Sequence, residues 1–378
     1  MKTTVQRLSL PDRRRVLMLS DPHGHADGLR AILKKAGFSP DDVLILLGDY
    51  LEKGSQSLET LRLVMALCRT HTVYPLMGNV DLWRLEFLES DDPGILEEFK
   101  RNSLKKAASP WGSSLLTEMC RELGTPLFEG TDMAALMPRI RRHFAPEIDF
   151  LRSLPTILET QRFIFVHGGV PHEDLAALEG TDAYPLLKFD DFYAAGLSFR
   201  KYVVVGHWPA VLNSPAYPVF DPIVDRQRHI ICLDGACGVK TEGQMNLMML
   251  PHWQSDDFSH LAWDDLPALT ALTAQSPSPA EAARYIRWND HAVTLLEEGG
   301  EMSRVLYKGK PMDVPTQFIF HHNGVLSCSD VTDYVLPVEP GDELRLILPL
   351  RRGCYVKKNG VAGWYFGRWE AKEKEGCV

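Results

Sequence analysis

Five short groups of polar residues, each following an apolar run, contain the side chains best suited to chemistry. The first two are Ser20-Asp21-Pro22-His23-Gly24-His25 and Gly48-Asp49-Tyr50-Leu51-Glu52-Lys53-Gly54. The other three are Gly78-Asn79-Val80-Asp81, His167-Gly168-Gly169 and Gly206-His207-Trp208. Their carboxylates, amide and imidazoles suit divalent metals such as Mn, Fe or Zn. Two Asp, one Asn and three His exceed the four ligands that one structural zinc needs.

The elements before these groups are expected to be strands of an α/β protein. Short apolar runs alternate with segments of helical period at residues 16–19, 43–47, 73–77, 163–166, 203–205 and 230–233. Loops at the carboxyl ends of such strands converge on one crevice, so residues far apart in sequence can form one site. Ser57 is expected to cap the helix after the second group. Pro75 fits a strand only at an edge or a bulge.

The order of the five groups and the residues within each resemble the motifs of the calcineurin-like superfamily of metal-dependent phosphoesterases. Within that superfamily they resemble the phosphoprotein phosphatase branch. That branch has Gly-Asp-x-His-Gly, Gly-Asp-x-x-x-Arg-Gly, Gly-Asn-His-Glu/Asp, His-Gly-Gly and Gly-His. The resemblance spans roughly residues 17–238, and Ser20 replaces the first Gly of the pattern. It implies a metallophosphoesterase β-sandwich flanked by helices. It also implies two divalent metal ions, with Mn²⁺ first and Fe or Zn as alternatives.

Carried over position by position, the resemblance assigns six metal ligands. It implies that Asp21 and His23 hold the first metal, that Asp49 bridges both, and that Asn79, His167 and His207 hold the second. For the Asp and Asn residues the competing interpretation is a turn or helix-cap residue after a strand. For His167 and His207 it is a hydrogen-bonded core histidine.

The residues assigned to substrate binding match the family pattern less specifically than the metal ligands do. Lys53 stands where the family has Arg, and we assign it to the substrate phosphate as a point charge, beside Asp49 in the catalytic group. A solvated surface lysine is the alternative. His25 and Arg200 are further candidates for binding substrate. The alternatives are that His25 is a polar residue of the first helical turn and that Arg200 is structural.

Two positions depart from the family pattern. Val80 stands where the family has the histidine thought to protonate the leaving oxygen, and Glu52 stands where phosphoprotein phosphatases have the aspartate that pairs with it. General acid catalysis contributes roughly a hundred- to ten-thousandfold. Its loss would slow attack on esters with poor leaving groups far more than attack on anhydrides or activated esters.

The resemblance predicts a metal-dependent phosphatase and leaves the substrate open. The segment from Phe150 to Pro155 resembles bacterial Ser/Thr protein phosphatases, so phosphomonoesters, including phosphoproteins, come first. The groups around His207 and Leu233-Asp234-Gly235-Ala236-Cys237 resemble symmetrical diadenosine tetraphosphatases, which makes dinucleoside polyphosphates the alternative. A third hypothesis is a catalytically weak binding protein, in which Val80 marks decay.

The sequence also suggests how the chain is divided. We expect a catalytic domain at 1–255 with a helical insertion at about 82–160, a linker at 256–283 around Ser276-Pro277-Ser278-Pro279, and a small all-β domain at 284–378. Near its end, Pro340-Gly341-Asp342 through Gly363-Trp364 resembles the closing strands of a bacterial SH3-like barrel. An unrelated β appendage is the alternative. This domain is a candidate for binding a protein or peptide.

Composition limits the partners. The formal net charge of −9 and the pI near 5.8 give no broad basic surface, so nucleic acid is an unexpected partner. Seven scattered cysteines without a Cys-x-x-Cys pair indicate thiols in a reducing compartment. The apolar run 16–19 is too short for a signal peptide or a membrane span, so we expect a cytoplasmic protein that does not contact the membrane.

Overall fold

A computed structural model describes residues 1–372 and divides the chain into two compact units. The first unit comprises Met1–Pro209 and Pro222–Asp264, and the second comprises Ala210–Asp221 and the chain from Asp265 onward. The expected linker at 256–283 contains two strands, β11 (Ser259–Trp263) in the first unit and β12 (Ala268–Ala271) in the second. The boundary between the units therefore falls between these strands.

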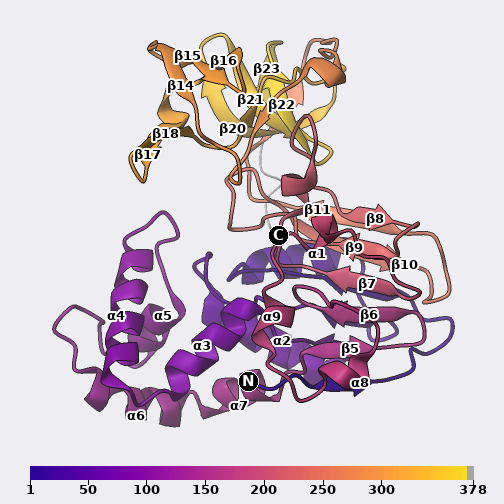
Figure 1. The fold of residues 1–378 in the computed structure, drawn as a ribbon, viewed down its shortest axis with the longest axis vertical. Coiled ribbons are helices and arrows are strands. Elements are labelled where there is room, and N and C mark those ends of the chain that lie inside the picture. The colour runs from indigo at the N-terminus through magenta and orange to yellow at the C-terminus, as the bar shows by residue number, and fades with distance from the viewer. Residues whose placement is uncertain (373–378) are drawn as a thin grey trace. The chain divides into compact units, whose positions relative to one another are not determined.

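Two sheets form the centre of the first unit (Figure 1). The five-stranded sheet has the order β11-β10-β2-β3-β4 and contains β2 (Val16–Leu19), β3 (Val43–Leu46), β4 (Thr72–Pro75) and β10 (Met245–Leu250). The six-stranded sheet has the order β1-β5-β6-β7-β9-β8 and contains β1 (Val5–Arg7), β5 (Ile157–Glu159), β6 (Phe163–Val166), β7 (Tyr202–Val205), β8 (Ile223–Asp225) and β9 (Ile230–Cys232). Strands β2, β3 and β4 run parallel, as do β6, β7 and β9. Pro75 lies in β4, which is an edge strand. The expectation that this proline, which has no backbone N–H, fits only at an edge or a bulge is therefore confirmed.

Alternating side chains of the central strands fill two different cores, because successive residues of a strand point to opposite faces. Val16 and Met18 of β2 belong to one buried cluster with Phe163 and Phe165 of β6, so the two sheets pack face to face. Leu17 and its alternate neighbours belong to a second cluster, which includes the buried faces of the flanking helices. The mixed α/β sandwich flanked by helices is therefore observed.

Helices cover the outer faces of both sheets. On the five-stranded sheet lie α1 (Ala26–Lys35) and α2 (Ser57–Thr70), whose leucines join the cluster that contains Leu17. On the six-stranded sheet lie the short α8 (Leu175–Leu178), α9 (Tyr184–Leu187) and the 3₁₀ turn η1 (Phe192–Ala195). Ser57 is the first residue of α2 and not its cap, because its hydroxyl accepts the backbone N–H of Glu52 (3.0 Å). This bond fastens the start of α2 to the second polar group.

The range in which we expected a helical insertion begins inside a helix and ends at a strand. It holds α3 (Asn79–Glu89), α4 (Pro93–Ala107), α5 (Leu115–Glu122), α6 (Met133–His143) and α7 (Ala145–Ser153), followed by β5. Their apolar faces pack into the cluster that contains Leu17, with Phe87 and Phe99 stacked at 4.9 Å between ring centroids. In Figure 1, α4 to α6 lie on one side of the first unit and β5 to β10 on the other.

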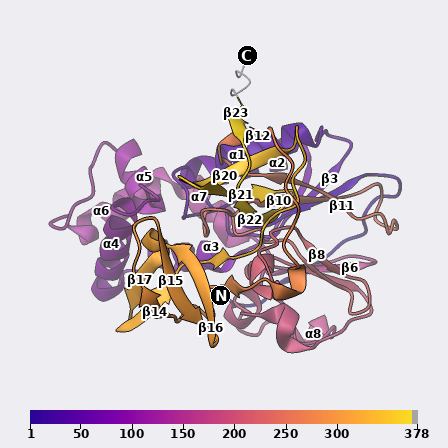
Figure 2. The same ribbon diagram turned by 90° about the horizontal axis from the view of Figure 1, so that it is seen from above.

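The second unit pairs its strands antiparallel. Its five-stranded sheet, of order β22-β21-β20-β12-β23, contains β20 (Glu343–Leu350), β21 (Gly353–Lys358), β22 (Val361–Tyr365) and β23 (Trp369–Ala371). A second sheet contains β14 (Thr294–Glu297), β15 (Met302–Tyr307) and β16 (Lys310–Pro315), seen side by side in Figure 2. Two pairs remain, β13 (Tyr285–Ile286) with β19 (Val331–Thr332) and β17 (Ile319–His322) with β18 (Val325–Cys328). The all-β expectation is confirmed, and the SH3-like barrel stays a prediction.

The sequence also led us to expect cysteines in the thiol form and a protein that does not contact the membrane. The six described cysteines form no disulfide with one another, and Cys377 lies outside the described residues. Through residue 372, none of the helices combines the length and the apolar character that crossing a bilayer requires.

Candidate metal centre

The five polar groups meet at the carboxyl ends of parallel strands from both sheets. Asp21, Asp49 and Asn79 follow β2, β3 and β4 of the five-stranded sheet. His167 and His207 follow β6 and β7 of the six-stranded sheet. Because the sheets pack face to face, these five strand ends open onto the same region, as the topology of α/β proteins leads one to expect.

Asp21, Asp49 and His167 form the centre of this region. One ligand atom of each lies within 4.8 Å of the others, and all three residues are buried. The Nε2 atom of His167 lies 3.4 Å from an oxygen of Asp49 and 3.9 Å from one of Asp21. His23 is also close, with Nε2 3.6 Å from Asp49 and 3.7 Å from Asp21. These four side chains therefore face a common point.

Asn79 and His207 complete the group at its edge. The Oδ1 atom of Asn79 lies 2.9 Å from His167 Nε2, and the rings of His167 and His207 have centroids 5.5 Å apart. His207 donates from Nε2 to Asp190 (2.6 Å), and its Nδ1 makes no hydrogen bond to a described residue. All six residues assigned to the metals from the sequence are thus brought together.

Backbone carbonyls orient two of the imidazoles. The carbonyl of Leu51 accepts from Nδ1 of His23 (3.1 Å), and that of Leu47 accepts from Nδ1 of His167 (2.6 Å). A carbonyl can only accept, so Nδ1 carries a proton in both rings and Nε2 is the nitrogen turned toward the carboxylates. This arrangement of outer hydrogen bonds is typical of histidines that bind metals.

The backbone at these positions is strained. Asp21, His23, Asp49 and His207 have φ between 41° and 63°, a left-handed conformation that non-glycine residues seldom adopt. Such strain gathers at functional sites, where the surrounding structure compensates for it. Gly78, which precedes Asn79, is needed for lack of space, because a Cβ at this position would lie 2.1 Å from the backbone nitrogen of Asp49.

Asp81 holds the strained turn, a role that the sequence did not reveal. Its carboxylate accepts from the backbone N–H groups of Asp49 (2.7 Å), Tyr50 (3.0 Å) and Gly78 (3.1 Å). It thereby joins the second and third polar groups. The only hint in the sequence is that Asp81 is the last residue of the third polar group, Gly78-Asn79-Val80-Asp81. Asp190, the partner of His207, has no comparable signal because it lies in an irregular segment.

Burial raises the pKa of three carboxyl groups in and around the centre, Asp81, Asp21 and Asp234. Burial, reinforced by the charge of Asp49, raises the pKa of Asp81 to about 8. Burial also raises the pKa of Asp21 to about 6, and it raises the pKa of Asp234, next to Asp21, well above its ordinary value. Burial alone would raise the pKa of Asp49 too, but the charges of His167, His23 and Lys53 and the hydrogen bond from His167 together outweigh burial and lower the pKa.

The histidines respond to the same charges. Burial opposes the charged form of His167, but the carboxylates of Asp49 and Asp21 outweigh burial and raise its pKa to about 10. Burial lowers the pKa of His23 well below its usual range, and the charge of Lys53 adds to this. Burial and the charge of His167 lower the pKa of His207 to about 4. Two neutral imidazoles therefore stand beside buried carboxylates.

This donor set fits divalent metal ions. Carboxylate and amide oxygens together with neutral imidazole nitrogens suit Mn, Fe and Zn, and a cation relieves the accumulated negative charge. Ligand atoms of Asp21, Asp49 and His167 within 4.8 Å of one another are close to the separation of donors around one ion at 2.0–2.2 Å. Asp49 lies between 3.4 and 3.6 Å from the Nε2 atoms of both His167 and His23.

The structure separates the three candidates for binding substrate. Lys53 is partly buried, and its Nζ lies 3.1 Å from Nε2 of His23, so it points into the centre. His25 bonds from Nδ1 to the carbonyl of Pro22 (3.1 Å), close to the centre but without a described contact to it. Arg200 lies before β7, at the opposite end of that strand from His207, where it is exposed and paired with Glu173 (3.1 Å). Arg200 is not brought to the site.

The structure shows what surrounds Val80 and Glu52, the two residues that depart from the family pattern. The Val80 side chain is buried in the cluster that contains Leu17. Glu52 is fully buried and accepts from Nε of Arg84 and from Nζ of Lys106 (3.0 Å). Arg84 lies one helical turn after Val80 on α3. An arginine therefore binds the carboxylate that the family resemblance would pair with an imidazole at position 80.

Comparisons with known proteins agree with this geometry. A family model described as calcineurin-like phosphoesterase matches residues 14–232. The symmetrical bis(5'-nucleosyl)-tetraphosphatase of Sodalis glossinidius (strain morsitans) is 29% identical over 181 residues, which are 45% of this chain and 52% of that protein. A protein of the same name from Salmonella paratyphi B is 27% identical over 180 residues, which are 44% of this chain and 51% of that protein. The chain spans about half the length of the curated relatives it matches.

A solved structure is similar over a longer stretch at lower identity. It is a protein serine/threonine phosphatase from Saccharomyces cerevisiae with similarity to human phosphatase PP5. The similarity covers 70% of this chain and 84% of that chain, with 12% sequence identity and a TM-score of 0.42.

Proposed function

The chain belongs to the calcineurin-like phosphoesterase family and is a metal-dependent phosphoesterase, and we propose that it acts on phosphates whose leaving group departs without a proton. Phosphoanhydrides and activated phosphomonoesters have such leaving groups. Alkyl phosphomonoesters, including phosphoserine in proteins, do not. The observation that carries this proposal is the buried valine at position 80, one helical turn before the arginine that binds Glu52.

Two divalent ions are the proposed cofactors, with Mn²⁺ first and Fe or Zn as alternatives. Asp21 and His23 would hold one ion, Asn79, His167 and His207 the other, and Asp49 both. Ions in such a site supply Lewis acidity toward phosphoryl oxygens and make water a stronger nucleophile. The protein contributes the rigid placement of the ligands, through the bonds of Asp81 and of the carbonyls that fix His23 and His167.

Lys53 is the proposed phosphate-binding residue. Its ammonium group points into the centre at 3.1 Å from His23, where an anionic substrate would replace the imidazole as its partner. The second polar group fixes its backbone in a left-handed conformation (φ 62°), as it does for Glu52 (φ 66°). Lysine supplies a point charge without the paired hydrogen bonds of arginine, so it attracts phosphate with less geometric selection.

The absence of an imidazole at position 80 separates the two substrate classes that the sequence leaves open. Glu52 cannot take over as proton donor in its present contacts, because the Arg84 and Lys106 cations outweigh burial and lower its pKa. Dinucleoside polyphosphates, whose anhydride leaving group needs little protonation, therefore rank above phosphoproteins. The curated relatives, named as symmetrical tetraphosphatases, support the same order. A weak binding protein is less favoured because all six proposed ligands converge.

Specificity constants for three substrates test the proposal. Purified protein loaded with Mn²⁺ is assayed with diadenosine tetraphosphate, p-nitrophenyl phosphate and phosphoserine, and the Asp49→Asn variant controls for contaminating phosphatases. We expect turnover of the first two and a specificity constant for phosphoserine at least about a hundredfold lower, the smallest usual contribution of a general acid. Phosphoserine turnover equal to that of p-nitrophenyl phosphate would show that another residue donates the proton. Bound metal without any turnover would favour the binding protein.

A further inference from the structure

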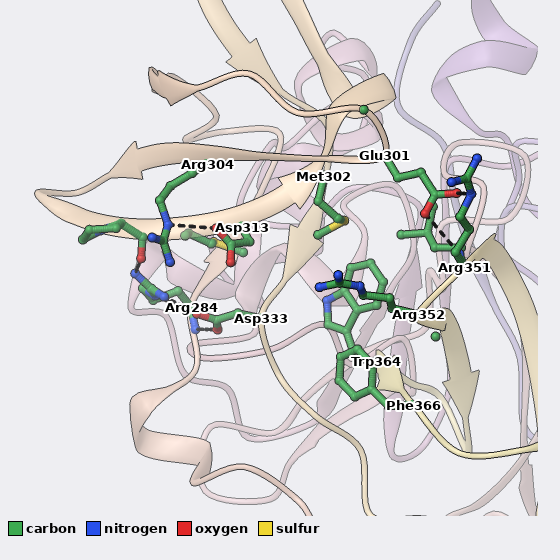
Figure 3. Close-up of a pocket in the computed structure, with 15 residues that line it drawn as sticks. Arg284, Glu301, Met302, Arg304, Asp313, Asp333, Arg351, Arg352, Trp364 and Phe366 are labelled. Carbon is green, nitrogen blue, oxygen red and sulfur yellow. Dashed lines mark hydrogen bonds and ion pairs between the residues drawn. The ribbon is translucent and has the colours of Figure 1, made fainter.

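A pocket lies entirely within the second unit, between its two larger sheets. It has a volume of about 910 Å³, which is in the range of sites for small molecules. Strands β15 and β16 line one side, and the turn between β20 and β21 and the end of β22 line the other. Figure 3 shows that side chains from both sides point into it. Nothing in the proposed phosphoesterase function uses this pocket.

Four arginines line the pocket, and three of them already have carboxylate partners. Arg284 pairs with Asp333 (2.5 Å) and Arg304 with Asp313 (3.0 Å). Arg351 is 89% exposed and pairs only loosely with Glu301, at 3.6 Å. The fourth is Arg352, whose guanidinium an anion can reach without displacing a carboxylate of the described residues.

Arg352 is exposed and makes no hydrogen bond or ion pair with any residue in the part of the chain that the structure describes. It extends from the turn between β20 and β21 and lies on the same side of the pocket as Trp364 and Phe366 (Figure 3). In a chain with a net charge of −9, an arginine without a carboxylate partner marks a local site for an anion. Arg351, which follows Leu350 in the same turn, can add a second guanidinium.

Two aromatic rings lie on the same side of the pocket. The rings of Trp364 and Phe366 are nearly parallel, with 10° between their planes and 6.2 Å between their centroids. Trp364 is fixed, because its indole N–H donates to the carbonyl of Thr332 (2.7 Å) and only 5% of it is exposed. Phe366 is 55% exposed, so its ring is open to stacking by a ligand.

We propose that this pocket binds a nucleoside phosphate, with the base against Phe366 and the phosphate on Arg352 and Arg351. A free guanidinium beside an exposed aromatic ring matches the two parts of such a ligand, its anionic group and its flat ring. Either feature alone would bind a nucleotide with little selectivity, since the binding energy of an exposed ion pair or of one stacking contact is modest. The two together distinguish a nucleotide from inorganic phosphate and from the free nucleoside.

Titration calorimetry of the full chain with α,β-methylene-ADP, which lacks a bridging oxygen to hydrolyse, tests the proposal. Wild type is compared with Arg352→Gln and Phe366→Ala, which we expect to bind about tenfold more weakly each, as the loss of a stacking contact or charged partner usually costs. Arg368→Gln and Trp369→Ala are matched controls, because both residues are exposed in the same segment and do not line the pocket. Both controls are expected to bind like wild type.

Further arms separate this pocket from the metal centre and identify the ligand. Arg352→Gln should keep wild-type turnover of p-nitrophenyl phosphate, and Lys53→Ala should keep wild-type affinity for the analogue. Equal affinity in wild type and both pocket variants, or loss of binding in Lys53→Ala alone, would place the nucleotide at the metal centre and overturn the proposal. Tighter binding of inorganic phosphate, adenosine or a phosphotyrosine peptide than of the analogue would also overturn it. Failure of the phosphoesterase assay leaves these outcomes unaffected.

Discussion

Arg84→Met is the substitution whose effect can be worked out most fully from the structure. Arg84 is 1% exposed and Glu52 is fully buried, so the ion pair between them has almost no solvent to screen it. Removing one partner of a buried pair leaves an uncompensated charge and typically costs about 3–5 kcal/mol. Lys106 stays 3.0 Å from Glu52 and offsets part of that loss. We therefore expect Arg84→Met to lower the free energy of unfolding by about 2–4 kcal/mol.

The loss should depend on pH in a defined direction. Burial alone would raise the pKa of Glu52, and Arg84 and Lys106 lower it below its ordinary value. The ionised carboxylate therefore stabilises the wild type above the pKa of the unfolded state, about 4.3, and this stabilisation is lost as pH falls through the lower folded-state value. Without Arg84, burial raises the pKa of Glu52, and the folded variant can protonate it. The difference between variant and wild type should then be smaller at pH 5 than at pH 7.

Urea unfolding followed by tryptophan emission measures this difference, because the Trp83 ring lies 4.8 Å from the guanidinium carbon of Arg84. Arg152→Met is the matched control. Arg152 pairs with two carboxylates, Glu89 and Asp149, but it is 55% exposed and screened by solvent, so its loss should cost much less than the loss of Arg84. Adding Glu52→Gln to Arg84→Met should recover part of the stability, because the uncompensated buried carboxylate is removed and Lys106, which then loses its partner, is 20% exposed. The reasoning fails if Arg84→Met costs no more than Arg152→Met, or if its cost does not change with pH.

Three further predictions concern the centre and the division of the chain. Asp49→Asn should abolish turnover and lower the bound metal together, as measured by elemental analysis, and an active variant with full metal content would contradict the ligand assignment. A chain ending at Asp264 should keep its turnover of p-nitrophenyl phosphate within about threefold, since each unit has its own core. Val80→His should raise the specificity constant for phosphoserine more than that for p-nitrophenyl phosphate. The gain should stay below about a hundredfold, because Glu52 is already bound by Arg84 and cannot orient the imidazole freely. An equal rise for both substrates would contradict that role for position 80.

The strands that position the metal centre could be predicted because their residues are buried on both faces. Residues 16–19 and 163–166 are continuous apolar runs, and the structure gives strands with these bounds. Once the strands were located, the polar residues just after them could be grouped, since parallel strands end on one side of a sheet. Arg200 does not follow that pattern, because it precedes β7 and lies at the opposite end of the strand from His207.

Contacts between irregular segments could not be predicted in the same way. His207 bonds to Asp190 across a stretch without regular structure, and no periodicity connects the two residues. The return of Ala210–Asp221 to the second unit depends on an antiparallel bridge between Val219 and Val361, which no local pattern in the sequence indicates. Hydrophobic periodicity reports which face of an element is buried, and it is silent on which partner buries it.

The environment of Glu52 shows how much this limitation matters for function. The sequence alone shows Val80 and Glu52 as two departures from the family pattern, which could mean decay of a proton-donating pair. In the structure a third residue, Arg84, occupies the carboxylate, and Lys106 from α4 adds a second cation. A decayed pair would leave a buried glutamate without a partner at a cost of several kcal/mol, whereas here its charge is fully engaged. The valine and the ion pair therefore fit the proposed restriction to leaving groups that need no acid better than they fit decay of the site.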